Sequence, residues 1–284
     1  MIKELPMSFL KSAALGLSAI GLSLGWAYSA QADVLPVQNL TFNEFTGTFT
    51  APKTLFTTAA PTDWAIGTTT GIISNLIGVG NQGSEGSSSG VYAVYTPAPG
   101  FSDTVPAGTN FYQADGNPQY ESSIIQTISG LTAGTTYTLQ FQQAAGQEVG
   151  FSGATTEQWK VFLGVGGIGV DCTTSPCTVT GTTNNLEEDS TLMNTPSEGI
   201  TNWNSDTLSF TPSASDLTDG TAVLTFLAWG NGGSTVNLPP TVFLEGVNTT
   251  PVVPEPATLS VLGVGLLGLG AIMMRRRNKR DAAA

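Results

Sequence analysis

Apolar and polar residues alternate with a period of two along much of this chain. The alternating stretches are rich in β-branched and aromatic residues, and segments rich in Gly, Pro, Ser and Asn separate them. This pattern predicts short β-strands that are half-buried on a sheet. The predicted strands cover residues 37–49, 91–95, 123–128, 135–144, 158–163, 207–210, 222–229 and 242–247. Residues 81–90 and 97–108 are predicted loops. Without a long amphipathic helix between the strands, an all-β antiparallel sandwich is expected.

The apolar run 257–274 departs from this alternation. It contains no charged residue, and as an α-helix it would span roughly 27 Å, about the thickness of a hydrocarbon core. A basic cluster follows at Arg275, Arg276, Arg277, Lys279 and Arg280. Such residues resist translocation, so we expect a transmembrane helix at 257–274 and a cytoplasmic tail at 275–284. Taken alone, this segment could also be an ordinary C-terminal anchor.

A second apolar run, 13–26, lies near the start of the chain. Lys3 and Lys11 precede it, and small residues, Ala30 and Ala32, follow it in the sequence Ala-Gln-Ala. A basic region, an apolar region and an A-x-A site in this order predict a signal peptide, residues 1–32, that is cleaved after Ala32. The alternative, a membrane helix at the start of the chain, is disfavoured by the short run. The protein is therefore expected to be exported.

Residues 250–256 form a Pro-rich linker that ends in the triplet Pro254, Glu255 and Pro256. A Pro-Glu-Pro triplet, an apolar span and a basic stop in this order resemble the PEP-CTERM signal of exported bacterial proteins. The resemblance covers about the last tenth of the chain. It implies processing by an exosortase-type membrane protease, with the protein anchored in the inner membrane before processing. Afterwards the protein would reside at the cell surface or outside the cell, and a removed tail leaves no membrane helix.

Between the two ends, residues 33–249 are expected to form one β-sandwich domain. Most of its charge is negative, because 18 of the 21 acidic residues but only two of the nine basic residues lie between positions 33 and 253. The resulting net charge of −16 there argues against nucleic acid as a partner, because no basic patch exists to replace phosphate counterions. It favours solubility and the attraction of cations.

The only two cysteines, Cys172 and Cys177, are separated by four residues. In an exported protein, such a close pair predicts a disulfide that staples a turn. A redox centre would favour Cys-x-x-Cys spacing, and a zinc site would need further ligands. The four-residue spacing disfavours the redox centre, and the absence of further Cys and of any His disfavours the zinc site.

Several segments resemble galactose-binding-like jelly-roll sandwiches, which are found in carbohydrate-binding modules. Residues 40–45 resemble the first strand, 61–64 the turn after it, 125–141 a strand–turn–strand unit, and 243–247 the closing strand. The resemblance implies a jelly-roll β-sandwich that contacts glycan. It also implies a structural calcium ion between the first and last strands, with Glu44 and Glu245 as the matching carboxylates. The alternative is a fibronectin-type sandwich, because residues 131–137 could form a tyrosine corner.

Two glycine-rich segments match sequence motifs that are found in enzyme active sites. Residues 164–169 match the dinucleotide fingerprint, but the following segment, which contains Pro176, cannot open the required helix. We therefore expect a hairpin bend there. Residues 86–90 match the nucleophile elbow, which needs a His base that this chain lacks, so they are interpreted as a linker.

Glycan binding is the function that this sequence favours, because sugar rings stack on aromatic side chains. Trp64, Trp203 and Trp229 lie beside turn-like or polar residues and are the candidate glycan platforms, although for each one alone burial is the commoner outcome, because Trp is largely buried in most folds. Trp159 alternates with apolar residues and is expected in the core. The partner would be extracellular polysaccharide, as in a biofilm matrix, and no enzyme activity is predicted. The alternatives are a structural matrix protein without a ligand and a glycan hydrolase with two carboxylates. Residues 187–189 are expected to form a solvated acidic loop.

Overall fold

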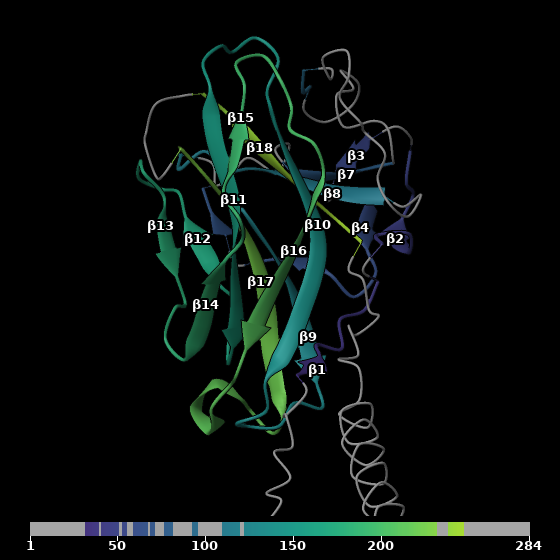
Figure 1. Ribbon diagram of the computed structural model, residues 1–284, viewed down its shortest axis with the longest axis vertical. Coiled ribbons are helices and arrows are strands. Elements are labelled where there is room, and N and C mark those ends of the chain that lie inside the picture. Colours follow the sequence, from purple (N-terminus) through teal and green to yellow (C-terminus); the bar gives the residue numbers. More distant parts are fainter. Residues whose placement is uncertain are drawn as a thin grey trace, which may run out of the picture. The chain divides into compact units, whose positions relative to one another are not determined.

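Figure 1 shows the computed structural model of the chain. It describes residues 32–39, 41–50, 53–55, 59–67, 69–71, 77–81, 93–95, 110–119, 122–231 and 238–246. The predicted membrane helix, the sorting motif and nearly all of the predicted signal peptide lie outside these residues. Within the described part of the chain, no helix is both long enough and apolar enough to cross a membrane.

Two antiparallel layers of strands make up the domain, and each contains four of the principal strands (Figure 1). The first sheet has the strand order β8 (Asn110–Asp115), β18 (Pro240–Glu245), β10 (Tyr137–Gln147) and β16 (Asn204–Phe210). The second sheet has the order β9 (Ser123–Ser129), β17 (Thr221–Gly230), β11 (Thr155–Gly164) and β14 (Asn185–Asp189).

The chain passes from one sheet to the other along these strands. β8, β10, β16 and β18 lie in the first sheet, and the strands between them in sequence, β9, β11, β14 and β17, lie in the second. The last strand, β18, inserts between β8 and β10. This alternation and strand order are those of a jelly roll. The predicted all-β jelly-roll sandwich is therefore confirmed.

Shorter strands extend and cover the two sheets. β1 (Asp33–Val34), β7 (Ile77–Asn81) and β3 (Lys53–Leu55) extend the first sheet, and β5 (Ala65–Ile66) and β15 (Met193–Thr195) extend the second. A small sheet contains β13 (Thr178–Thr180), β12 (Gly169–Asp171) and β6 (Thr69–Thr70), and β2 (Phe45–Gly47) pairs with β4 (Ala59–Pro61). A 3₁₀ turn, η2 (Ala214–Asp216), precedes β17.

The hydrophobic core lies between the inner faces of the two sheets. Alternate residues of each strand point inward, so Leu139 and Phe141 of β10 face Trp159 and Val161 of β11 across the core, and Phe226 of β17 joins them. Trp159 is fully buried, as expected, and its indole N–H donates to the Phe243 carbonyl at 3.1 Å. This bond ties the second sheet to the backbone of the first.

Two expectations about local structure were wrong. The predicted strand 37–49 contains a turn at Asn39 and Phe42, whose φ angles are +46° and +49°, so that only β2 remains extended there. The predicted acidic loop 187–189 belongs instead to β14, which lies at the edge of the second sheet with these three side chains exposed. Charged side chains on an edge strand keep other chains from pairing with it.

A tyrosine corner is present within this jelly roll. Gly130 and Gly134 adopt φ angles of +83° and +79° in the turn between β9 and β10. The turn lets the Tyr137 hydroxyl accept a hydrogen bond from the Thr132 N–H at 2.8 Å. The corner therefore occurs here without the fibronectin-type fold that was its expected context.

Candidate functional site

The three candidate tryptophans occupy three different places. Trp64 lies in the core, where it is 6% exposed and packs against Phe42 and Phe226, with ring centroids 5.6 and 6.2 Å away. Its indole N–H donates to the Asn39 carbonyl at 3.2 Å. A buried ring with its polar atom already bonded offers no face to a sugar.

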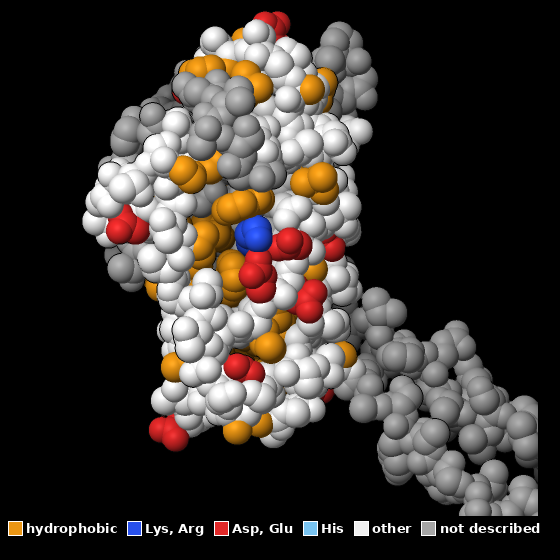
Figure 2. All heavy atoms as spheres, turned by 90° about the vertical axis from the view of Figure 1, so that its left-hand side faces the viewer, with side chains coloured by type: hydrophobic (Ala, Val, Ile, Leu, Met, Phe, Trp, Pro, Cys, Tyr) orange, Lys and Arg blue, Asp and Glu red, His pale blue; other side chains and the backbone are white. Residues whose placement is uncertain are grey.

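Trp229 lies on the outer face of the second sheet. The Lys160 ammonium lies 4.8 Å from its ring centroid and 2.7 Å from a Glu187 carboxylate oxygen. Figure 2 views the molecule from the side of β12, β13 and β14, and a basic side chain there lies between hydrophobic and acidic ones. A lysine above the ring competes with any sugar for the same surface.

Trp203 lies on the outer face of the first sheet, just before β16. It forms an aromatic cluster with Phe111 of β8 and Phe243 of β18. The centroid of Trp203 is 6.2 Å from each phenylalanine ring, and the two phenylalanine rings are 5.4 Å apart. Trp203 is half-buried, so part of its surface is still accessible to a ligand.

The strand register places polar side chains beside this cluster. Gln113 of β8 pairs with Phe243, and Thr241 of β18 pairs with Asp115, all with side chains on the outer face. On the other side of β8, the partners of Gln113 and Phe111 are Gly78 and Gly80 of β7.

Gln113 and Thr241 carry unused hydrogen-bonding capacity. Both residues are fully buried, yet the Gln113 amide oxygen and nitrogen and the Thr241 hydroxyl have no hydrogen-bond partner within the described chain. Leaving a buried polar group unpaired costs about 1–3 kcal/mol, so such groups are rare in stable folds. A polar ligand on this face would satisfy them. The cluster of Phe111, Gln113, Trp203, Thr241 and Phe243 is hereafter called the outer-face site.

The two carboxylates proposed for calcium occupy different environments. Glu245 is buried, 1% exposed, at the end of β18, where it pairs with Phe111 and Gln142. Glu44 is exposed before β2, and its backbone carbonyl accepts bonds from Asn39 and Thr62. Among the described residues, no group of three or more His, Cys, Asp or Glu side chains could hold a metal ion. Calcium binding stays a prediction.

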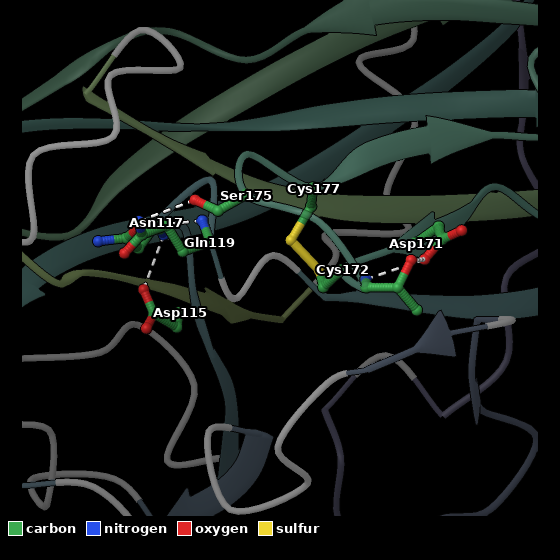
Figure 3. The surroundings of a disulfide bond; sticks show 8 residues. Asp115, Asn117, Gln119, Asp171, Cys172, Ser175 and Cys177 are labelled. Atoms are coloured by element: carbon green, nitrogen blue, oxygen red, sulfur yellow. Dashed lines mark hydrogen bonds between the residues drawn. A yellow bond between two sulfur atoms is a disulfide. The ribbon is translucent and has the colours of Figure 1, made fainter.

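The predicted disulfide between Cys172 and Cys177 is confirmed. It closes the tip of the hairpin between β12 and β13 (Figure 3). The Cys177 N–H donates to the Pro118 carbonyl at 2.6 Å, and the Gln119 side chain donates to the Ser175 hydroxyl at 2.8 Å. These bonds attach the hairpin tip to the segment that follows β8.

Replacing both cysteines by serine should lower the free energy of unfolding by about 2 kcal/mol, the entropy expected for so short a covalent loop. Unfolding in urea, with and without a reductant, measures the change. The reductant should destabilise the parent protein by the same amount and leave the double variant unaffected. A reductant effect on the double variant would contradict this assignment.

Sequence reasoning missed Phe111, Gln113 and Thr241. The strand that carries two of them, β8, is buried on both faces, so its residues do not show the apolar–polar alternation of a half-exposed strand. The closing strand β18 was expected, but Thr241 lies just before the predicted start.

Comparison with known proteins identifies the tail. Residues 252–277 match the PEP-CTERM protein-sorting motif. No curated protein matches the chain. Among solved structures, the matches include the enzymatically active domain of a bacteriophage CBA120 tailspike protein, at 11% identity and a TM-score of 0.31, covering 66% of this chain but 19% of that one. The chain therefore spans only a small part of the tailspike protein.

Two other matches span nearly the whole of the similar chain. A Stig cyclase from Fischerella sp. TAU is 14% identical, with a TM-score of 0.43, and the match covers 75% of this chain and 94% of the cyclase. A CBM4 structure is 17% identical, with a TM-score of 0.31 and coverage of 75% and 97%. Further carbohydrate-binding modules also match. All these TM-scores lie below 0.5, so no residue role is transferred. What the family match does establish is that this chain carries a PEP-CTERM sorting motif, which marks an exported protein sorted at its C-terminus.

Proposed function

We propose that this protein is exported, processed at its tail by an exosortase-type protease and retained at the cell surface or in the extracellular matrix. There the outer-face site binds a polysaccharide chain without cleaving it. The observation that supports this most directly is that three buried polar atoms on Gln113 and Thr241, beside an aromatic cluster, have no hydrogen-bond partner among the described residues.

The chemistry of the outer-face site suits a sugar. The apolar face of a pyranose ring stacks on an aromatic side chain, here Trp203, while its hydroxyls need both donors and acceptors. The Gln113 amide offers one of each, and the Thr241 hydroxyl can act as either. Both are buried in this structure and Trp203 is half-buried, so a sugar would contact Trp203 first, and the residues around Gln113 and Thr241 would have to move before it could reach them.

Charge favours a neutral glycan over an acidic one. The net charge of −16 over residues 33–253 would repel a polyanion. Salt screens such repulsion between exposed charges, so any binding of acidic polysaccharide should strengthen as the salt concentration rises. Binding of a neutral chain should change little.

A hydrolase is less well supported, because a glycosidase needs two carboxyl groups that reach the same glycosidic bond. Burial raises the pKa of Glu157 to about 7, a value suited to an acid catalyst, but this side chain lies in β11 and is fully enclosed. Its Oε2 atom accepts a bond from the Thr195 hydroxyl at 2.7 Å inside the protein.

Trp203→Ala should weaken binding of the polysaccharide at least tenfold, about 1.4 kcal/mol, because aromatic side chains that become buried in the complex dominate such contacts. Affinity electrophoresis of residues 33–249 in gels containing the host's extracellular polysaccharide measures the effect. Gln113→Met, which keeps the side-chain volume but removes the amide, should also weaken binding.

Trp229→Ala is the matched control, because it removes the same type of side chain from the opposite sheet. It should leave the retardation unchanged. Equal losses for Trp203→Ala and Trp229→Ala would reject the outer-face site, and a parent protein that is not retarded by any polysaccharide would favour a purely structural role. Repeating the gels with calcium and with a chelator tests the predicted ion.

A further inference from the structure

The first residues after the predicted signal-cleavage site are built into the fold. β1 runs parallel to β10, with Asp33 beside Tyr137 and Val34 beside Thr138. The Asp33 N–H donates to the Thr136 carbonyl and the Leu35 N–H to the Thr138 carbonyl, each at 2.9 Å. Residues 33–38, here called the strap, therefore begin as an added strand of the first sheet.

The other end of the strap is held by the second sheet. Gln126 is an inward-facing residue of β9 and is 3% exposed. Its amide oxygen accepts the Gln38 N–H at 2.7 Å, and its amide nitrogen donates to the Gln38 carbonyl at 2.9 Å. A buried glutamine that bonds both backbone groups of one residue acts as a clamp and explains why this polar side chain lies in an apolar row.

Apolar side chains fix the strap between its two ends. Leu35 is 1% exposed and Val37 is 7% exposed, and both belong to the main core. The strap thus joins the two sheets, and releasing it would expose two core side chains and break the hydrogen bonds at both ends. Its first residue, Asp33, directly follows Ala32, the last residue of the predicted signal peptide.

We propose that folding closes the signal-cleavage site, so that hydrolysis of the Ala32–Asp33 bond must precede docking of the strap. Proteases commonly bind the residues around the scissile bond as an extended strand, through their backbone groups. In the folded domain the Asp33 N–H already bonds to Thr136, and the Asp33 carbonyl accepts from the Thr138 hydroxyl at 3.3 Å. A chain that folded first would keep its signal peptide.

Cleavage in the expected order is compatible with the final structure. Hydrolysis adds water across the amide bond, giving a carboxylate on Ala32 and an ammonium group on Asp33. The ammonium group keeps N–H donors, so it can still bond to the Thr136 carbonyl. The mature chain end would then be a strand of the first sheet, which ties down a terminus that is otherwise prone to fraying.

The test uses the full chain, 1–284, folded in detergent micelles and treated with the peptidase that removes signal peptides. A variant with a flexible six-residue spacer between Ala32 and Asp33 keeps the strap but moves the cleavage site away from the sheet. Gln126→Ala loosens the strap without changing any residue near the cleavage site. We expect the parent to be cut at least tenfold more slowly than the spacer variant, with Gln126→Ala in between.

Circular dichroism on each variant checks that the sandwich is folded, and sequencing of the product identifies the new first residue. Cleavage of the folded parent at the rate of the spacer variant would overturn the proposal. A product that does not begin at Asp33 would overturn it as well. Neither result depends on whether the outer-face site binds glycan, so either proposal can be rejected without affecting the other.

Discussion

Glu157→Gln is expected to stabilise the protein at pH 8 by up to about 3 kcal/mol. Burial raises the pKa of the Glu157 carboxyl from 4.5 to about 7. One pKa unit is worth about 1.4 kcal/mol, so keeping this carboxylate ionised inside the protein costs about 3 kcal/mol. Glutamine has nearly the same shape, carries no charge, and its amide oxygen can still accept the bond from Thr195.

The stabilisation gained by Glu157→Gln should grow as the pH rises. The folded protein binds the Glu157 proton more tightly than the unfolded chain, because the pKa is higher in the folded state. The contribution of Glu157 to stability is therefore fully present below pH 4.5 and is lost as the pH rises towards about 7. The parent and Glu157→Gln should be equally stable near pH 4 and should diverge between pH 4.5 and 7.

Urea unfolding at pH 4, 6 and 8 measures this divergence. Glu188→Gln is the control, because it removes the same charge from an exposed position on β14, where substitutions change stability by no more than about 0.5 kcal/mol. A variant at position 157 that is less stable than the parent at pH 8 would show that the carboxylate has a stabilising role there.

Trp159→Ala should be the most damaging single substitution in the core, with a loss of about 3–5 kcal/mol. Trp159 is fully buried and lies 5.9 Å, centroid to centroid, from both Tyr112 and Phe226. Alanine would leave a cavity between the sheets and remove the bond from the indole N–H to Phe243. For a domain of this size, the melting temperature should fall by roughly 6–20 °C.

Trp159→Phe separates the effect of the cavity from that of the lost hydrogen bond, because phenylalanine keeps an aromatic ring but has no indole N–H. It should cost clearly less than Trp159→Ala, since most of the cavity is filled. Thermal unfolding followed by near-ultraviolet circular dichroism compares the three proteins. Equal losses for alanine and phenylalanine would assign the effect to the hydrogen bond rather than to packing.

Several features of this protein could be predicted from local sequence because their cause is local. β10, β11 and β17 were expected because each has an inward row of apolar residues, and the class of fold followed from many such strands without helices. The disulfide followed from two nearby cysteines in an exported chain. The sorting tail followed from the order of a triplet, an apolar span and a basic cluster.

Sequence alone could not assign the three tryptophans, because burial depends on contacts made over long distances in the chain. Trp64 is enclosed by Phe42 and Phe226, and Phe226 lies more than 150 positions away. Trp229 lies under the Lys160 side chain of a neighbouring strand. Each tryptophan stands beside turn-like or polar residues, and this does not distinguish a core ring from an outer-face ring.

By itself, the sequence determined the sorting tail, the strands with a clear inward row of apolar residues (β10, β11 and β17) and the pairing of the cysteines, because each of these depends on neighbouring residues. Only the tertiary structure decided the outer-face site. The jelly-roll order inserts β18 beside β8, and this register brings Gln113 next to Phe243 and both near Trp203. Hydrogen bonds between strands that are distant in sequence set that register, and no short segment of the chain contains them.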